Sequence, residues 1–455
     1  MKRYSALLLA LLLAAQTISC GDSGKNQTET TENSGETTAK ADGYEFSEKW
    51  SGRELTILNP YDIYSMHSEL DRETQTGEPL DDAMYDRCRK LEEKMGIKIV
   101  EDNTPKIDKE VNELALKTIM AGEDQYDIMY VSTNGIYSLA EQEALTDLKT
   151  LSGLNLDQSW WQTNYNKLCE MKGSLYAAVS PAHLMYIDSL WCLFFNEDKI
   201  TDLKLEMPYD LVRDGKWTLD TLLTCQKAAA DLKGDESFEW NEAGSSVYGL
   251  SGRMVTKLLA GAGELILDKD KNGDLLFTAG TERFYSACEK IAKNVSKNDG
   301  INFNNYTGGL KDGDPGHYIT MFEVERALFV SAEICKTSRM RNKDFGYGIV
   351  PMPKLDESQE SYYASPFDGC PMLTIPKTAK DKDFSAAAAD ALSYISASDV
   401  LPVYKEITLE SKGLRNDDSI EMLGIILDGI TPDLSYLYTG IIKDFSNQLQ
   451  TAITE

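Results

Sequence analysis

Short apolar runs alternate with longer segments in which apolar residues recur every three or four positions. After about residue 44, the runs 54–58, 97–100 and 126–131 predict strands. The segments 80–95 and 107–118 show helical spacing and predict amphipathic helices. This order of strands and helices predicts a mostly parallel sheet with helices on both faces. The predicted fold class is therefore α/β.

The predicted helices carry end signals. Asp81 and Asp82 would lie in the first turn of the helix over 80–95, where negative charge is favourable, and Gly96 suits its end. Thr218 is a predicted N-cap for a helix that runs to residue 232.

The later part of the chain repeats the alternation less regularly. An Ala-rich helix is expected over 384–397. Further strands are expected over 175–179, 190–195, 327–330, 347–350 and 372–375.

Residues 1–20 have the pattern of an export signal that ends at a cysteine. After a basic start, 6–15 is an unbroken run of Ala and Leu that is too short to span a bilayer. The segment resembles the signal of bacterial lipoproteins, which implies that Cys20 is lipidated and becomes the new N-terminus. Thr17 departs from that signal, which usually has Leu there. A plain secretory signal, cleaved elsewhere, is the alternative.

Residues 21–43 are almost entirely small or polar. Such a segment cannot bury enough apolar surface to offset its ordering entropy, so we expect a disordered tether. The layout predicts an exported body held on the outer face of the cell membrane by an N-terminal lipid.

The length of the chain indicates the number of domains, and its net charge excludes some classes of partner. The body from residue 44 to 455 is long enough for two domains. With 46 basic and 74 acidic residues, the net charge of −28 argues against nucleic acid or an anionic membrane surface as partners. The eight cysteines are widely spaced and form no CxxC pair, so a zinc site is not expected. We expect buried thiols, with one disulfide left open as an alternative.

Signatures of enzymes are sparse. The chain has three histidines and contains no HExxH, GxSxG or GxxxxGK[ST] motif. We therefore expect no catalytic residues, no enzymatic activity and no cofactor.

One string resembles the first half of a calcium loop, with oxygen ligands at alternate positions. Ala279 stands where such a loop needs a bidentate acid, so the candidate is weak. The alternative is a polar turn between strands over 265–267 and 275–277. The candidate ligands are Asp268, Asp270, Asn272 and Asp274.

Aromatic and short polar residues follow several predicted strands. Tyr61 and Asp62 follow the first strand, and Thr133 and Asn134 follow the third. Ligands of open parallel sheets sit beyond the carboxyl ends of the strands, so these residues predict a site for a hydroxyl-rich ligand. Each aromatic residue could instead belong to the core.

The body resembles the extracellular solute-binding proteins of family 1, the maltose-binding type that serves ABC importers. Stretches that carry the resemblance occur in order over about 50–445. They include GRELTILNP, YDIMYVS, KGSLYAAVSP, LWCLFFNEDKI, YGLSGR, ALFVSAEI and YGIVPMPK.

The resemblance implies a type II periplasmic-binding-protein-like fold with two α/β lobes, joined by hinge strands, that hold solute in the cleft between them. The first lobe would comprise 44–188 and about 366–408. The second lobe would comprise 189–365 and about 409–455. It also implies a monomer that delivers its solute to the permease subunits of an ABC transporter.

The resemblance also implies a set of contacts to the solute. Many sugar sites of the family have a tryptophan where Ala332 or Glu333 stands here; the pair at 160–161 either substitutes for it or packs on the first lobe. A sugar or oligosaccharide is the expected solute; a peptide or another small polar compound is the alternative, and an exported enzyme the weaker one. The implied residues are Tyr61, Asp62, Thr133, Asn134, Asp188, Trp191, Arg253, Met254, Glu333, Phe367, Asp368 and Tyr436.

Overall fold

The computed structural model describes residues 43–60, 66–252, 254–304, 310–311, 313–442 and 445–454. Contacts divide the chain into a first unit, Met1–Lys40, and a body, Ala41–Glu455, and only the body contains described residues. The predicted signal, Cys20 and almost all of the tether lie outside the described residues, as do Tyr61, Asp62 and Arg253. In the described part of the chain, no helix is long and apolar enough to cross a membrane.

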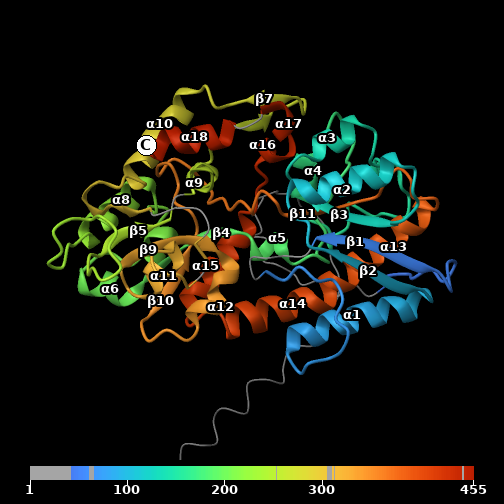
Figure 1. The fold of residues 1–455 in the computed structure, drawn as a ribbon, viewed down its shortest axis with the longest axis horizontal. Helices are drawn as coiled ribbons and strands as arrows, with labels where there is room; N and C mark the ends of the chain where they lie inside the picture. The colour runs from blue at the N-terminus through green and yellow to red at the C-terminus, as the bar shows by residue number, and fades with distance from the viewer. Residues whose placement is uncertain are drawn as a thin grey trace, which may run out of the picture. The chain divides into compact units, whose positions relative to one another are not determined.

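The first sheet has the order β11-β3-β1-β2. β1 pairs in parallel with β2 and β3, and β11 pairs antiparallel with β3. The connecting helices α1 and α2 lie on opposite sides of this sheet (Figure 1), which confirms the predicted strand–helix order. The bounds are β1 (Glu54–Pro60), β2 (Lys98–Thr104), β3 (Ile128–Ser132), β11 (Pro371–Thr374), α1 (Pro79–Met95) and α2 (Lys109–Met120).

The second sheet has the order β10-β4-β9-β5-β8. β5 is parallel to β8 and β9, whereas β4 is antiparallel to β9 and β10. The α/β fold class is confirmed, but this sheet is mixed, because β4 runs antiparallel to its neighbours β9 and β10. The bounds are β10 (Tyr347–Val350), β4 (Trp191–Asn196), β9 (Ala327–Glu333), β5 (Tyr248–Ser251) and β8 (Asn302–Phe303).

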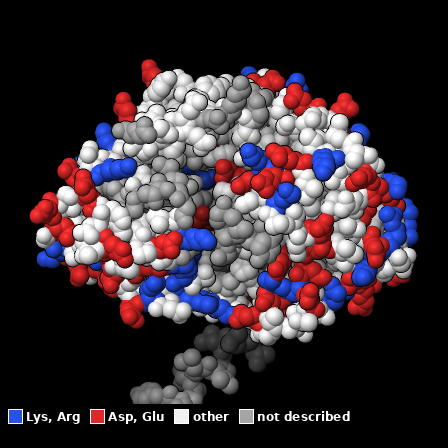
Figure 2. Space-filling view, viewed as in Figure 1, with Lys and Arg blue, Asp and Glu red and all other residues white. Residues whose placement is uncertain are grey.

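Helices and one small hairpin complete the described body. The hairpin is β6 (Leu267–Lys269) with β7 (Leu275–Phe277). The remaining α-helices are α3 (Ile136–Glu141), α4 (Thr163–Cys169), α5 (Met185–Asp188), α6 (Glu197–Asp202), α7 (Pro208–Arg213), α8 (Leu219–Ala229), α9 (Val255–Gly261), α10 (Glu282–Asn294), α11 (Tyr318–Glu323), α12 (Thr337–Met340), α13 (Lys382–Ile395), α14 (Leu401–Val403), α15 (Asp417–Asp428), α16 (Leu434–Leu437), α17 (Thr439–Ile442) and α18 (Phe445–Thr454). On the face shown in Figure 2, acidic and basic side chains are interspersed.

The structure confirms the predicted signals at both ends of α1 and at the start of α8. Asp81 and Asp82 lie in the first turn of α1, and Gly96 ends the helix with φ 66°, the left-handed conformation that favours glycine. The Thr218 side chain accepts a hydrogen bond from the Thr221 amide and caps α8.

One predicted strand, over 175–179, is wrong. Only Ala178 forms a bridge there, to Leu373 of β11. The neighbouring amides bond to side chains instead: Val179 N donates to Asn166 Oδ1 over 2.8 Å, and Leu175 N donates to Asp147 Oδ1 over 3.0 Å. Because these amides are taken by side chains, a ladder cannot extend along the segment.

A long helical path connects the two sheets. α13 continues through a π-helical turn, η4 (Ser396–Val400), and α14 into a second, η5 (Tyr404–Ser411). Pro402 lies within α14 and lacks the amide that a regular helix would use. The path packs on α1 beside the first sheet, and just beyond its end Gly413 O accepts a hydrogen bond from Tyr347 of β10.

Replacement of Gly249 by alanine tests the packing of β5 on α8. An added Cβ would lie 2.6 Å from Gln226 Cα, which is backbone and cannot move aside cheaply. We expect Gly249→Ala to lower the free energy of unfolding by about 1–3 kcal/mol. Gly424→Ala, in α15 with open space around its Cβ, is the matched control and should raise it by up to about 1 kcal/mol. Equal urea midpoints for both variants would contradict this packing.

Candidate functional site

Asp188 joins three segments of the chain at the point where α5 leads into β4. The residue is fully buried. Its Oδ2 accepts hydrogen bonds from His67 N over 2.6 Å and pairs with His67 Nδ1 over 2.8 Å. Its Oδ1 accepts a hydrogen bond from the Tyr404 hydroxyl on η5. Both carboxylate oxygens are therefore used within the protein.

The electrostatics of this pair favour the charged forms of both groups. Burial by itself raises the pKa of Asp188, but the His67 charge, the His67 hydrogen bonds and the Tyr404 hydroxyl outweigh it and hold the pKa below its usual value. Burial by itself lowers the pKa of His67, but the Asp188 carboxylate outweighs it and raises the pKa. The pair is thus an ion pair at mildly acidic pH.

The turn after β3 is held by a side chain of α2. Asn112 Oδ1 accepts from Ser132 N over 2.8 Å, and Asn112 Nδ2 donates to Asn134 O over 2.8 Å. Thr133 is buried, and its amide and hydroxyl both donate to Cys370 O, over 3.0 and 2.6 Å. The predicted contacts Thr133 and Asn134 therefore lie against the segment that precedes β11.

That segment carries Phe367 and Asp368, both half-buried. Asp108 lies beside it: burial, and then the Asp368 charge, raise the pKa of Asp108 to about 6. A Cβ on Gly369 would fall 2.0 Å from Asp108 Oδ1, which shows how closely these two segments approach.

Lys257, from α9, is the central cation of the region. The residue is 2% exposed, and its Nζ donates to Pro366 O over 2.5 Å. Its Nζ also lies 5.1 Å from the centre of the Tyr436 ring. Burial lowers the pKa of Lys257, while three nearby carboxylates oppose the shift. These carboxylates belong to Asp368, Asp433 and Glu333.

Trp191 and Glu333 face each other across the antiparallel pair of β4 and β9. Trp191 is 4% exposed, and its indole N–H is buried and has no hydrogen-bond partner among the described residues. A buried donor of this kind is unusual, because leaving it unpaired costs free energy. The amide of Trp191 donates to Ser365 O over 3.3 Å. This hydrogen bond connects β4 to the segment that contains Pro366, the residue whose carbonyl accepts from Lys257.

Three of the predicted contacts, Asp368, Glu333 and Tyr436, lie near Lys257. Met254 is the N-cap residue that precedes α9, and the carbonyl of Tyr436 accepts from Gly135 N over 3.0 Å, so α16 meets the turn after β3. Asp188 lies in a separate cluster with His67 and Tyr404. Sequence reasoning missed Lys257, Asp433 and Asp108, because a helical lysine or a loop acid gives no signal of burial. Asp368, Glu333 and Tyr436 interact with Lys257 directly. The other predicted contacts lie on segments joined to these by backbone pairing or hydrogen bonds: Thr133, Asn134, Trp191, Met254 and Phe367.

The tryptophan pair at 160–161 does not substitute for a second-lobe tryptophan. The indole N–H groups of Trp160 and Trp161 both donate to Asp390 Oδ1, over 3.1 and 2.9 Å. Asp390 belongs to α13, which packs against α1 beside the first sheet. The structure therefore favours the packing alternative for this pair.

The calcium-like string forms the turn of the β6–β7 hairpin. Asp270 Oδ1 accepts from Asn272 N over 2.8 Å and from Asp274 N over 3.0 Å. These backbone hydrogen bonds hold the pKa of Asp270 below its usual value. In the described part of the chain, no group of three or more acidic, His or Cys residues is arranged to hold a metal ion, and Asp268 is not part of one.

The cysteines of the described body are free thiols, and six of the seven are buried. Burial raises the pKa of the Cys88, Cys169 and Cys370 thiols to about 12. They behave as small apolar residues, as the sequence predicted.

Solved structures with this arrangement are binding proteins. A cyclo/maltodextrin-binding protein complexed with maltotetraose matches with a TM-score of 0.57 at 14% identity, over 91% of this chain and 93% of that chain. An ABC substrate-binding protein from Listeria monocytogenes in complex with cycloalternan matches with 0.56 at 14%, over 88% and 93%. Maltose-bound MalE3 of T. maritima matches with 0.56 at 12%, over 88% and 94%.

The chain has the fold of these two-lobed solute-binding proteins. Its structural neighbours are the maltose and oligosaccharide type that the sequence resemblance predicted. No protein-family model and no curated protein matches the chain.

Removal of the His67 side chain tests the ion pair. The raised pKa of His67 means that its contribution is full below the ordinary His value of 6.5 and is lost as pH rises through the folded value. The lowered pKa of Asp188 means that its contribution is full above 3.8 and is lost as pH falls through the folded value. We expect His67→Ala to cost about 1–3 kcal/mol between these values, and less at pH 8.

Thermal unfolding of the wild-type protein and of His67→Ala across pH 3.5–8.5 measures this difference in stability. Tyr404→Phe is the control, because it removes a neutral partner of Asp188 and should lower stability by an amount that stays constant between pH 5 and 8. A deficit in His67→Ala that grows from pH 6 to 8 would have the wrong sign for this pair.

Proposed function

We propose that the protein is a membrane-anchored extracellular solute-binding protein that captures a sugar or oligosaccharide and delivers it to an ABC transporter permease. The observation that carries the proposal is the match of fold over nearly the full length of both chains to proteins solved with maltotetraose, cycloalternan and maltose. These neighbours are binding proteins, which also favours binding over catalysis for this chain.

The chemistry around Lys257 supports a polyhydroxylated ligand. Tyr436 and Phe367 offer apolar ring faces, and Asp368 offers acceptors for hydroxyl groups. The unpaired indole N–H of Trp191 offers a donor that a ligand oxygen would satisfy. We place the solute between a first lobe of 44–188 with 366–408 and a second lobe of 189–365 with 409–455. In this proposal the monomer closes on the solute as the lobes approach.

A second candidate solute is a compound that carries a positive charge, such as an amino compound or a basic peptide. Among the described residues, three carboxylates interact with Lys257: Asp368, Asp433 and Glu333. Carboxylates gathered in one region favour a cationic ligand. This alternative uses the same residues and differs only in the class of solute.

Calorimetric titration distinguishes the two classes and tests the site. Maltotetraose and maltoheptaose should bind, and a ligand bound only by the folded state should raise the melting temperature. Phe367→Ala, which removes one ring, should weaken binding by about 1–3 kcal/mol. Trp191→Phe keeps a ring but removes the N–H, and should weaken binding by about 1–2 kcal/mol.

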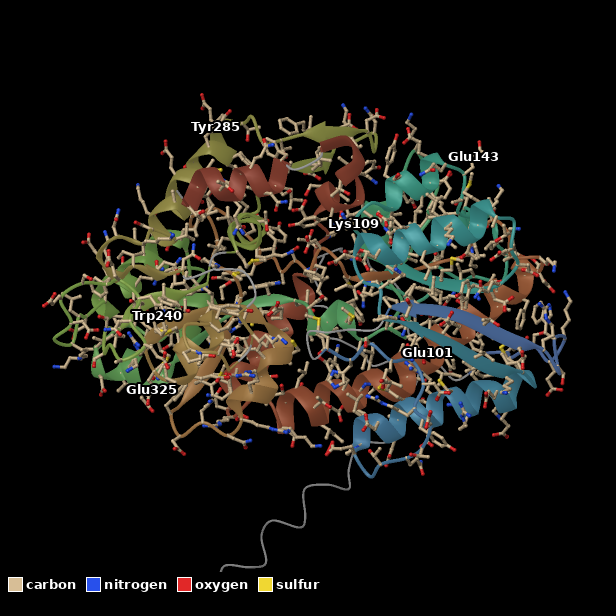
Figure 3. The ribbon with its side chains drawn as sticks, in the orientation of Figure 1. Glu101, Lys109, Glu143, Trp240, Tyr285 and Glu325 are labelled. Atoms are coloured by element: carbon tan, nitrogen blue, oxygen red, sulfur yellow. The ribbon has the colours of Figure 1, made fainter. Side chains whose placement is uncertain are left out.

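Tyr285→Ala is the matched control, since Tyr285 is 59% exposed on α10 at the outer edge of the body (Figure 3). Binding of lysine-rich peptides but not of sugars would favour the cationic alternative. Unchanged affinity in both site variants, with circular dichroism showing an intact fold, would place the site elsewhere.

We also propose that Cys20 carries the lipid anchor, on the strength of the basic start, the apolar run and the position of the cysteine. Mass spectrometry of the native protein should find acyl groups on an N-terminal Cys20, and Cys20→Ala should release the protein from membranes. Cys88→Ala, which changes a buried thiol, is the control and should leave the protein membrane-bound. An unmodified N-terminus at another residue would contradict the anchor.

A further inference from the structure

One pocket lies outside the region around Lys257. It has a volume of about 610 Å³, within the ~300–1,000 Å³ of ligand pockets. Its walls come from the start of the described body, from the loop at 153–160 and from α13. None of its lining residues belongs to the cluster around Lys257. The residues that the argument uses are Tyr44, Phe46, Trp50, Asn155, Gln158 and Trp160.

The buried carboxylate of Asp390 fixes the walls of this pocket, and we call it the Asp390 pocket. Asp390 is fully buried. Tyr44 OH donates to its Oδ2 over 3.1 Å, and Asn155 Nδ2 donates to the same oxygen over 2.7 Å. Asn155 N and the indole N–H groups of Trp160 and Trp161 donate to its Oδ1, over 3.1, 3.1 and 2.9 Å. Segments far apart in sequence are thereby held in one arrangement.

The aromatic rings of the pocket are held by each other as well. Tyr44 stacks on Tyr394, with ring centroids 4.4 Å apart and 16° between the planes. Phe46 lies 4.7 Å and Trp160 lies 5.6 Å from the Tyr44 ring. Of the four lining rings, those of Tyr44, Phe46 and Trp160 are half-buried, so part of each faces solvent, whereas Trp50 is buried. Rings that are already ordered do not have to lose rotamer freedom when a ligand binds.

Polar groups stand beside these rings. Asn155 and Gln158 are exposed at the loop, and Glu45 and Ser47 also line the pocket. Flat apolar faces edged by amide, hydroxyl and carboxylate groups suit sugar rings, which have apolar C–H faces and hydroxyl edges. A peptide of apolar side chains would leave these polar groups desolvated and unpaired.

We propose that the Asp390 pocket is a glycan-binding site, for an oligosaccharide, separate from the proposed solute site around Lys257. The pocket begins at Gly43, directly after the predicted tether, so it lies where the body meets the segment that leads to the proposed anchor. The glycan could come from two sources with the same chemistry: a soluble oligosaccharide, or a polysaccharide strand of the cell envelope.

Binding measurements on the full mature protein test the pocket, with two probes. Maltoheptaose represents the soluble source and is titrated by calorimetry. Isolated peptidoglycan represents the envelope source and is used in co-sedimentation. The double variant Phe46→Ala, Gln158→Ala removes one ring and one amide and leaves the hydrogen bonds of Asp390 intact. Tyr285→Ala, an exposed aromatic of α10, is the matched control.

We expect the double variant to weaken binding of at least one probe tenfold or more, with a melting temperature that shows an intact fold. In the calorimetric titration with maltoheptaose, wild type should show two binding sites and the double variant should show one. Phe367→Ala should leave the affected site unchanged, which separates this pocket from the proposed solute site. The proposal is overturned if neither probe binds wild type, or if the double variant, folded, binds both probes as wild type does. It is equally overturned if Tyr285→Ala loses binding to the same extent.

Discussion

The carboxylate of Asp188 is the constraint on which the connection between the two sheets depends. A fully buried charge is costly unless it is paired and hydrogen-bonded, and Asp188 meets this requirement only through His67 and Tyr404. His67 comes from the segment after β1, and Tyr404 comes from the helical path that continues from α13. The fully buried Arg87 acts in the same region: its Nη1 donates to Ala182 O over 2.8 Å and to Ser396 Oγ over 3.2 Å. Together these charges hold the crossing segments in place, so any movement between the sheets must preserve their hydrogen bonds or replace them.

Much of the fold could be predicted from sequence, because local pattern and local chemistry agree there. The strand over 347–350 has the predicted bounds, α1 ends at the predicted Gly96, and α8 begins after the predicted cap Thr218 but ends at Ala229, before the predicted residue 232. The strand over 175–179 could not be excluded, because the hydrogen bonds that prevent it come from Asn166 and Asp147, which are side chains of other segments. The mixed strand directions of the second sheet could not be predicted either, because they also depend on contacts between distant segments. Strand direction depends on where the chain enters the sheet, and that is a tertiary property.

The sequence led to residues for the candidate site, but it did not indicate the electrostatics of the region around Lys257. Residues that follow strands, such as Thr133, or precede them, such as Asp368, fall where the general geometry of open sheets places ligands. No sequence pattern predicted that Lys257 would be buried, since in the sequence it is an ordinary polar residue of a short helix. Its burial depends on Pro366 and Tyr436, which lie more than a hundred residues away in sequence. Resemblance to a family implied a set of contact residues, and the structure shows which acids interact with Lys257.

The two π-helical turns in the path from α13 to η5 have a consequence for how this protein tolerates change. A π turn holds one residue more than an α turn, so it is the form that a helix takes when it accommodates an inserted residue without breaking. Each residue rotates the following part of a helix by about 100°. Shortening the path by one residue would therefore turn Tyr404 away from Asp188, whereas substitutions that keep its length would leave that contact in place. Among relatives, the length of this segment should consequently vary far less than its composition.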